Sequence, residues 1–220
     1  MEKVEKIGVT DGYPTKLRAV DTIVPLQWSM YAFRDNLYAV LANGQLQDPN
    51  ERPIVRLQSY CSIGQTLGGA LCDCGDQLEN SKNIIANATS GAVILNWSHE
   101  GRGAGLRKHF EAHFLHQNEG IDSVEAYEKL GLEVDPREYD GEIAIMRELG
   151  LQRICLLSNN PRKTLPLEEA GFDVVRMPLL VPENEYNTRQ LEVRRKKLGH
   201  LIPVNGNGSS LPSTNGNGTH

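Results

Sequence analysis

The middle of the chain reads Gly91-Ala-Val-Ile-Leu-Asn-Trp-Ser-His-Glu-Gly-Arg-Gly-Ala-Gly-Leu106. Residues 91–97 form a continuous apolar run of strand length, which predicts a strand buried on both faces. The glycines that follow predict a loop, and residues 106–117 return to helical spacing. A buried strand that leads through a glycine-rich loop into a helix is a building unit of α/β folds.

The segments on either side repeat this alternation. Strand-like runs cover residues 53–60, 153–157 and 171–175, helical spacing covers 74–86, 139–149 and 183–198, and a further helix opens at Asn159-Asn-Pro161. This order predicts an α/β (α+β) fold, with a mixed sheet, flanking helices and at least some parallel pairing. Residues 1–50 have mixed strand and loop character, and we expect them to form a smaller N-terminal sheet region.

Composition separates a folded part from a tail. The last residues are mostly Gly, Asn, Ser and Pro, which cannot bury enough apolar surface to offset the entropy lost on ordering. We therefore expect one catalytic domain over residues 1–202, with 1–50 as its flanking region, and a disordered tail over 203–220.

Bulk properties exclude several classes of protein. The net charge is −5, whereas nucleic-acid binders normally present a basic field. We find no apolar run of ~18 residues, and no apolar leader follows the charged N-terminus, so we expect neither membrane insertion nor secretion. Because the thiols discussed below are expected to stay reduced, the predicted location is the cytoplasm.

Three of the four cysteines, Cys61, Cys72 and Cys74, lie in one short segment. Three thiolates leave one position of a tetrahedral zinc ion open, which is typical of catalytic sites because structural zinc sites use four protein ligands. The pattern predicts such an open zinc site. Two alternatives stay open: inert buried thiols, and a zinc site closed by a histidine from elsewhere in the chain.

Two loops have the character of phosphate sites. In the first, the glycines around Arg102 allow the backbone to approach a phosphate at a helix N-terminus, and the adjacent Glu100 can hold a metal ion or bond an amino group. In the second, Ser158, backbone amides and Lys163 follow a strand and begin a helix. A plain tight turn and an ordinary capped helix start are the respective alternatives.

A third element is Asp135-Pro-Arg137, a segment stiffened by its proline. An arginine here can clamp a phosphate with two hydrogen bonds, and the carboxylate can orient it or accept a proton. Taken alone, the pair is more typical of a surface ion pair. Its occurrence together with the thiols and the two loops favours a nucleotide site.

Together these motifs resemble the GTP cyclohydrolase II family. The resemblance covers roughly residues 56–202. Besides Cys61, it rests on Cys72–Leu78, Glu100–Leu106, Asp122–Ala126, Leu130–Arg137, Leu157–Lys163 and Lys197–Leu201.

The resemblance implies hydrolysis of the imidazole ring of a purine nucleotide, with GTP as the expected substrate, and release of formate and pyrophosphate at the entry to riboflavin biosynthesis. It implies a zinc ion on Cys61, Cys72 and Cys74, Mg2+ with the phosphates, and a homodimer. By position, Arg137 matches the nucleophile at the α-phosphorus and Asp135 its proton acceptor. Seven further positions match nucleotide contacts: Arg56, Gln77, Glu100, Arg102, Ser123, Ser158 and Lys163.

Departures from the family pattern gather around the metal and the base. Carboxylates are missing at Tyr60 and Gln65, and Leu71 stands where the family usually has an arginine beside the metal. The tyrosine expected to serve ring opening is replaced by His113, which we predict to be the proton-transferring group because imidazole exchanges protons near neutral pH.

These departures leave two alternatives to GTP hydrolysis. One is a diverged cyclohydrolase that opens another purine or pyrimidine base, in uracil catabolism or secondary metabolism. The other is a non-catalytic protein that only binds nucleotides. In each case we expect a small-molecule nucleotide ligand, and no nucleic-acid or membrane partner.

Overall fold

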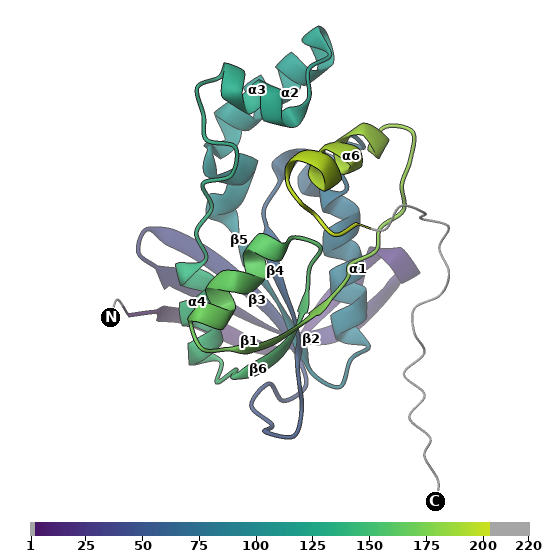
Figure 1. Cartoon of the computed structure of the whole chain (residues 1–220). Coiled ribbons are helices and arrows are strands. Elements are labelled where there is room, and N and C mark those ends of the chain that lie inside the picture. The colour runs from purple at the N-terminus through teal and green to yellow at the C-terminus, as the bar shows by residue number, and fades with distance from the viewer. Residues whose placement is uncertain (1–2, 203–220) are drawn as a thin grey trace, which may run out of the picture.

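The computed structural model describes residues 3–202, so the tail expected at 203–220 lies outside the described residues. The chain forms one seven-stranded sheet in the order β1-β2-β3-β5-β4-β6-β7 (Figure 1). Its strands are β1 (Glu5–Leu17), β2 (Thr22–Phe33), β3 (Asn36–Asn43), β4 (Ile54–Ser59), β5 (Gly91–Asn96), β6 (Arg153–Leu157) and β7 (Asp173–Met177).

The sheet has an antiparallel half and a parallel half. Strands β1, β2, β3 and β5 pair antiparallel, whereas β5, β4, β6 and β7 pair parallel. The mixed α/β fold is therefore confirmed. The N-terminal strands were expected as a smaller region, and they are instead continuous with the main sheet, because β3 pairs with β5 from Tyr38↔Asn96 to Asn43↔Gly91.

Among the described residues, the five helices expected from the sequence pattern are present, together with a further helix, α3, that it did not predict. They are α1 (Cys74–Ala86), α2 (Gly105–Glu119), α3 (Ser123–Lys129), α4 (Asp140–Glu148), α5 (Thr164–Glu169) and α6 (Thr188–Lys197). Asn160 caps the turn before α5 as predicted, since its side chain accepts a hydrogen bond from the Arg162 amide at 3.0 Å.

The starts of two elements differ from the prediction by two residues or more. Helix α6 begins five residues later than expected, because the side chains of Asn184 and Asn187 each accept the other's backbone amide and form a closed turn. Strand β7 begins two residues late, because Gly171 takes φ +91° and the Phe172 amide bonds back to the Leu167 carbonyl at 3.0 Å.

Alternating strand residues send apolar side chains to both faces of the sheet. On one face Val40 and Ile94 pack with Ile145 of α4, and on the other Leu41 and Val93 pack with Ile85 of α1. Helices α2 and α3 project from this body and have a small apolar cluster of their own (Figure 1).

The carboxyl ends of the parallel strands β4, β5 and β6 meet at one edge of the sheet. Strand β4 leads into Cys61, β5 into the glycine-rich loop, and β6 into Ser158. Ligands of open α/β sheets bind at this edge. The topology thus gathers the three sequence motifs in one place.

Candidate active site

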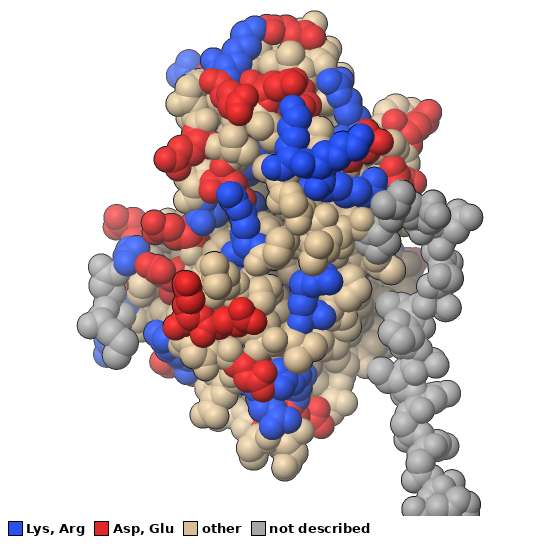
Figure 2. Space-filling view, in the orientation of Figure 1, with Lys and Arg blue, Asp and Glu red and all other residues tan. Residues whose placement is uncertain are grey.

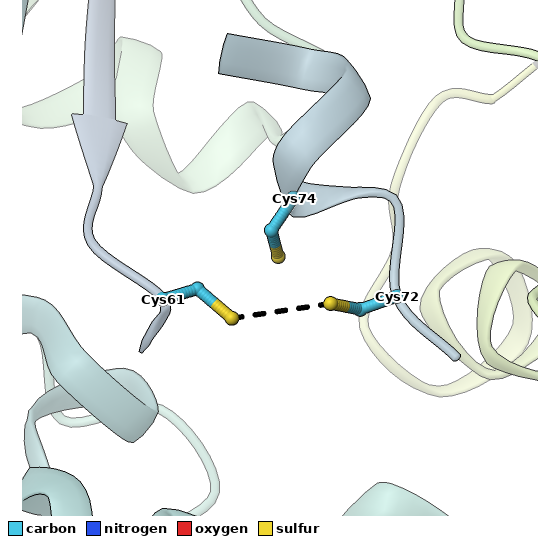
Figure 3. Close-up of side chains that lie close together, drawn as sticks. All are labelled: Cys61, Cys72 and Cys74. Carbon is cyan, nitrogen blue, oxygen red and sulfur yellow. Dashed lines mark hydrogen bonds between the residues drawn. The ribbon is translucent and has the colours of Figure 1, made fainter. Parts of the chain in front are cut away.

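The three cysteines converge as predicted. Cys61 follows β4, Cys72 precedes α1 and Cys74 is the first residue of α1, and their sulfur atoms point toward one another (Figure 3). The sulfurs lie within 4.8 Å of one another, with Cys61 and Cys72 at 3.9 Å. A tetrahedral zinc ion with Zn–S bonds of about 2.3 Å places its sulfur ligands about 3.8 Å apart. The donor set therefore fits zinc.

Glycines allow this close approach. A Cβ atom on Gly64 would lie 2.6 Å from the Cys72 sulfur, and one on Gly75 would lie 2.6 Å from the Gly64 carbonyl oxygen. Hydrogen bonds with Cys61 and Cys72, followed by the charge of Arg194, hold the pKa of Cys74 well below its usual range, although burial opposes this. Cys74 therefore favours the thiolate, which is the metal-binding form, whereas hydrogen bonds with Cys61 and Cys74 together with burial raise the pKa of Cys72, and the pKa of Cys61 is also raised.

The glycine-rich loop holds Arg102 in a strained backbone conformation. Arg102 has φ 55°, in the left-handed region that disfavours side chains other than glycine. Its guanidinium compensates by donating to the Val134 carbonyl and the Ser123 hydroxyl, both at 3.0 Å, and by stacking 4.8 Å from the Tyr127 ring. Two residues that were predicted to bind the nucleotide, Arg102 and Ser123, are thus in direct contact.

Glu100 lies behind the cavity. Its carboxylate accepts the Ser62 amide at 2.7 Å and contacts Nδ1 of His109. The His109 ring packs edge-to-face on His113, with 4.9 Å between ring centroids, and His113 faces the cavity. Burial, and then the charge of His109, lower the pKa of His113 to about 4, so this imidazole is neutral at physiological pH.

Asp135 and Arg137 form a buried pair. Arg137 donates from Nε and Nη2 to the two Asp135 carboxylate oxygens at 2.6 and 2.7 Å, and from Nη1 to the Ser59 hydroxyl at 3.1 Å. The Asp135 side chain is 7% exposed and the Arg137 side chain 13% exposed, so the alternative of a surface ion pair is wrong. Burial opposes the charge on Asp135, but Arg137 outweighs it and holds the pKa of Asp135 below its usual value.

Two more cations complete the wall of the cavity. Arg56 of β4 donates to Gln77 of α1 at 2.7 Å, and Lys163 donates to the Leu57 carbonyl at 2.7 Å. Burial, followed by repulsion from Arg56 and Arg137, lowers the pKa of Lys163 well below its usual value. A bound anion would relieve this repulsion.

All predicted site residues line this one cavity except Glu100 and Asp135, which lie directly behind lining residues. Sequence reasoning missed His99, Arg194 and His200, which also line it. His99 lies in the stretch that leads into the glycine-rich loop and His200 in the closing motif Lys197–Leu201, so these two had a local signal. Arg194 comes from α6, and nothing in its neighbourhood along the chain indicates the contact.

The fold and the site define a class of protein. It is a mixed α/β protein with three cysteines that could hold a metal ion, in a cavity that is also lined by buried cations. The sequence model of a family described as GTP cyclohydrolase II matches residues 18–178. The chain belongs to the GTP cyclohydrolase II family, which confirms the resemblance found in the sequence.

Three relatives illustrate the extent of the similarity. A probable bifunctional riboflavin biosynthesis protein, RIBA 2 of Oryza sativa subsp. japonica, is 38% identical over 89% of this chain and 36% of its own length. The riboflavin biosynthesis protein RibBA of Aquifex aeolicus is 37% identical over 81% of this chain and 46% of its own. GTP cyclohydrolase-2 of Shewanella sediminis is 37% identical over 81% of this chain and 90% of its own. The chain therefore spans less than half of the two longer relatives and nearly all of the third.

Within residues 3–202, no helix combines the length and apolarity needed to cross a bilayer.

Proposed function

We propose that this chain is a hydrolase that opens the imidazole ring of a purine nucleotide, with GTP as the first substrate to test, and releases formate and pyrophosphate. One observation carries the proposal: three cysteine sulfurs with zinc-binding spacing share a cavity with buried cations. The family and the relative named GTP cyclohydrolase-2 support this reaction. The riboflavin biosynthesis proteins among the relatives support a role in that pathway.

Cys61, Cys72 and Cys74 would hold the metal, because thiolates are soft ligands that suit zinc. When bound, zinc supplies Lewis acidity and activates water at neutral pH. We propose that Mg2+ accompanies the phosphates, since their hard oxygen atoms are its preferred ligands.

The cations of the cavity would bind the phosphates. Arg56, Arg102 and Lys163 bring positive charge that is poorly screened because the side chains are buried. Arg137 acts at the α-phosphorus, and Asp135 holds its guanidinium in plane and accepts the proton. The contact of Arg137 with Asp135 supports this division of roles.

The remaining predicted residues would bind the nucleoside. Gln77, Ser123 and Ser158 line the cavity and offer hydrogen-bonding groups. Glu100 would act through His109, which its carboxylate contacts. His113 would move the proton during ring opening, since its imidazole is in the neutral form that accepts a proton, although its lowered pKa makes it a weaker base than a free imidazole.

Replacing any one of Cys61, Cys72 and Cys74 by serine tests the metal chemistry. Each variant should lose zinc and formate production, while pyrophosphate release continues at a measurable rate, because Arg137 and Asp135 are unchanged. Cys155→Ser is the matched control, since Cys155 lies on β6 and does not belong to the cluster. Full formate production by all three variants would overturn the proposal.

A second candidate, a diverged cyclohydrolase for another base, is favoured by the five imidazoles that line the cavity among the described residues, those of His99, His109, His113, His116 and His200. A panel of purine and pyrimidine nucleotides, analysed by mass spectrometry for opened ring, formate and pyrophosphate, separates the two. Turnover of none of them, with binding retained, would indicate a protein that only binds nucleotides.

We also propose that the protein acts as a homodimer in the cytoplasm, as family members are expected to do. Sedimentation velocity at micromolar concentration should give one species of twice the chain mass of 24.4 kDa. A monomer under these conditions would contradict the dimer without affecting the proposed chemistry.

A further inference from the structure

Arg194 of α6 reaches the metal centre from a distant part of the chain. Its Nη1 contacts the Asp73 carboxylate, and its Nη2 lies 3.8 Å from the Cys74 sulfur. The Arg194 side chain is 13% exposed and the Asp73 side chain 1% exposed. A buried ion pair is therefore in direct contact with a predicted zinc ligand.

The pair continues into a hydrogen-bonded chain. The second oxygen of Asp73 accepts from Gln77 at 2.7 Å, and Gln77 accepts from Arg56, also at 2.7 Å. Asp73 thus links Arg194 of the C-terminal helix to Arg56 of the central strand β4. The carboxylate lies between the two predicted ligands Cys72 and Cys74, so its orientation fixes the backbone that carries both.

Charge explains why two arginines belong here. Three thiolates on a divalent cation leave a net charge of −1, and the buried Asp73 carboxylate adds another negative charge. Arg194 and Arg56 supply the two positive charges that compensate. Uncompensated charge in a buried site is strongly unfavourable, so loss of either arginine should weaken the centre.

We propose that Arg194 is a positioning residue of the metal centre: it holds Asp73 in place and offsets the charge of the thiolates, so that metal binding and the docking of α6 stabilise each other. This inference rests on the proposed function for the identity of the metal as zinc. It extends the active site to a helix that no motif of the sequence assigns to it.

Helix α6 has further attachments, so Arg194 can be changed without releasing the helix. Lys197 pairs with Asp122 and Glu125 at the start of α3, and the Leu201 amide donates to the Asn159 carbonyl at 2.8 Å. Figure 2 shows the Lys and Arg side chains that gather over α6. Lys196, in the last turn of α6, is 74% exposed and pairs only with Glu192 of the same helix among the described residues, which makes it a matched control.

Zinc affinity measured by competition with a chromophoric chelator tests the inference. Arg194→Met should weaken zinc binding by about 10- to 100-fold, as is typical when a residue that orients a metal ligand is lost. Lys196→Met removes the same charge from the same helix and should change affinity by less than about twofold, because exposed pairs contribute little. Arg194→Lys keeps the charge without the planar fork and should recover part of the loss.

A second experiment needs no variant. Hydrogen exchange of the unaltered protein with and without zinc should show slower exchange in Leu191–Lys197 when zinc is bound, and no change in α4. Unchanged exchange in α6, or equal zinc affinity of Arg194→Met and the unaltered protein, would overturn the inference. Failure of the unaltered protein to bind zinc would instead overturn the metal chemistry of the proposed function.

Discussion

Glu142 lies 3.6 Å from Nδ1 of His99, which lines the cavity, and each residue is nearly inaccessible to solvent. The Asn96 amide donates to one Glu142 oxygen at 3.1 Å, and the other oxygen has no hydrogen-bond partner among the described residues. Burial raises the pKa of Glu142 to about 7 and lowers the pKa of His99 to about 3. Both residues therefore favour their neutral forms, as buried groups do.

Glu142→Gln should change how stability depends on pH. The carboxyl ionises near 4.5 in the unfolded chain and near 7 in the folded protein. Stability is therefore lost as pH rises through this window, because the unfolded state binds fewer protons there. Relative to the unaltered protein, Glu142→Gln should gain up to about 3 kcal/mol between pH 4.5 and pH 8.

Urea unfolding at the two pH values measures this change. Glu148→Gln on the exposed side of the same helix is the control and should show no pH-dependent gain. A stability difference for Glu142→Gln that is the same at both pH values would contradict the assignment of the pKa.

His113→Ala should separate chemistry from binding. If His113 transfers the proton, the rate of formate release should fall about 100- to 10,000-fold, while nucleotide affinity changes little. Single-turnover formate release and equilibrium binding of the nucleotide measure the two quantities. Equal losses in both would reduce His113 to a packing residue against His109.

At the scale of single residues, the sequence predicted which side chains meet where those residues lie in one short motif. The three cysteines and the Asp135–Arg137 pair lie in short local motifs, so their side chains had little freedom to separate. Arg194 was missed because its contact with Asp73 depends on how α6 packs, which no local pattern encodes. The burial of Glu142 was missed for the same reason, since its position on α4 resembles that of an ordinary helical glutamate.

Among the elements, α4 shows packing that overrides helix propensity. Gly141 stands in its first turn, where alanine would normally be preferred by about 1 kcal/mol. A Cβ atom there would lie 2.0 Å from the hydroxyl oxygen of Tyr38 on β3. The glycine is therefore required by the contact between helix and sheet.

Gly141→Ala should destabilise the protein by about 1–3 kcal/mol despite the gain in propensity, because Tyr38 is buried and cannot move freely. Tyr38→Phe in the same chain removes the clashing oxygen and should restore part of the loss. Thermal unfolding of both variants and of Tyr38→Phe alone tests this. A stabilised Gly141→Ala variant would show that α4 shifts easily on the sheet.

Elements were predicted well where burial set the sequence pattern. Helix α1 has apolar residues at helical spacing and strand β5 has a continuous apolar run, and their expected ranges match within a residue. The start of α6 was predicted poorly because its first residues carry no apolar spacing. Paired asparagine side chains, rather than helical periodicity, decide where it begins.

At the scale of the whole molecule, one sheet joins the N-terminal strands to the strands that carry the site. The apolar core on the α4 face includes Tyr31 of β2 as well as Leu156 of β6. This continuity was not predicted, since residues 1–50 show no pattern that identifies their pairing partner. Strand β3 pairs with β5, which follows it about fifty residues later in the chain, and no local pattern identifies a partner at that distance.

The shared core predicts a single unfolding transition for residues 1–202, in keeping with the one domain expected from the sequence. The two tryptophans report on different halves, Trp28 from β2 and Trp97 from the end of β5. Trp28→Phe leaves Trp97 as the only fluorescent tryptophan, and Trp97→Phe leaves Trp28. For each variant, the denaturation midpoint from fluorescence should therefore equal the midpoint of the same variant from circular dichroism. An earlier midpoint for the Trp28 signal would show that the N-terminal half unfolds by itself.

The cavity cations already have acceptors within the protein: Asp135 for Arg137, the Leu57 carbonyl for Lys163 and the Val134 carbonyl for Arg102. These bonds use only part of the N–H donors of each cation, since a guanidinium has five and an ammonium three, so a molecule with several anionic oxygens can accept from the rest. We therefore expect free bases and nucleosides, which lack these oxygens, to bind more weakly than nucleotides. Discrimination by charge thus precedes discrimination by shape.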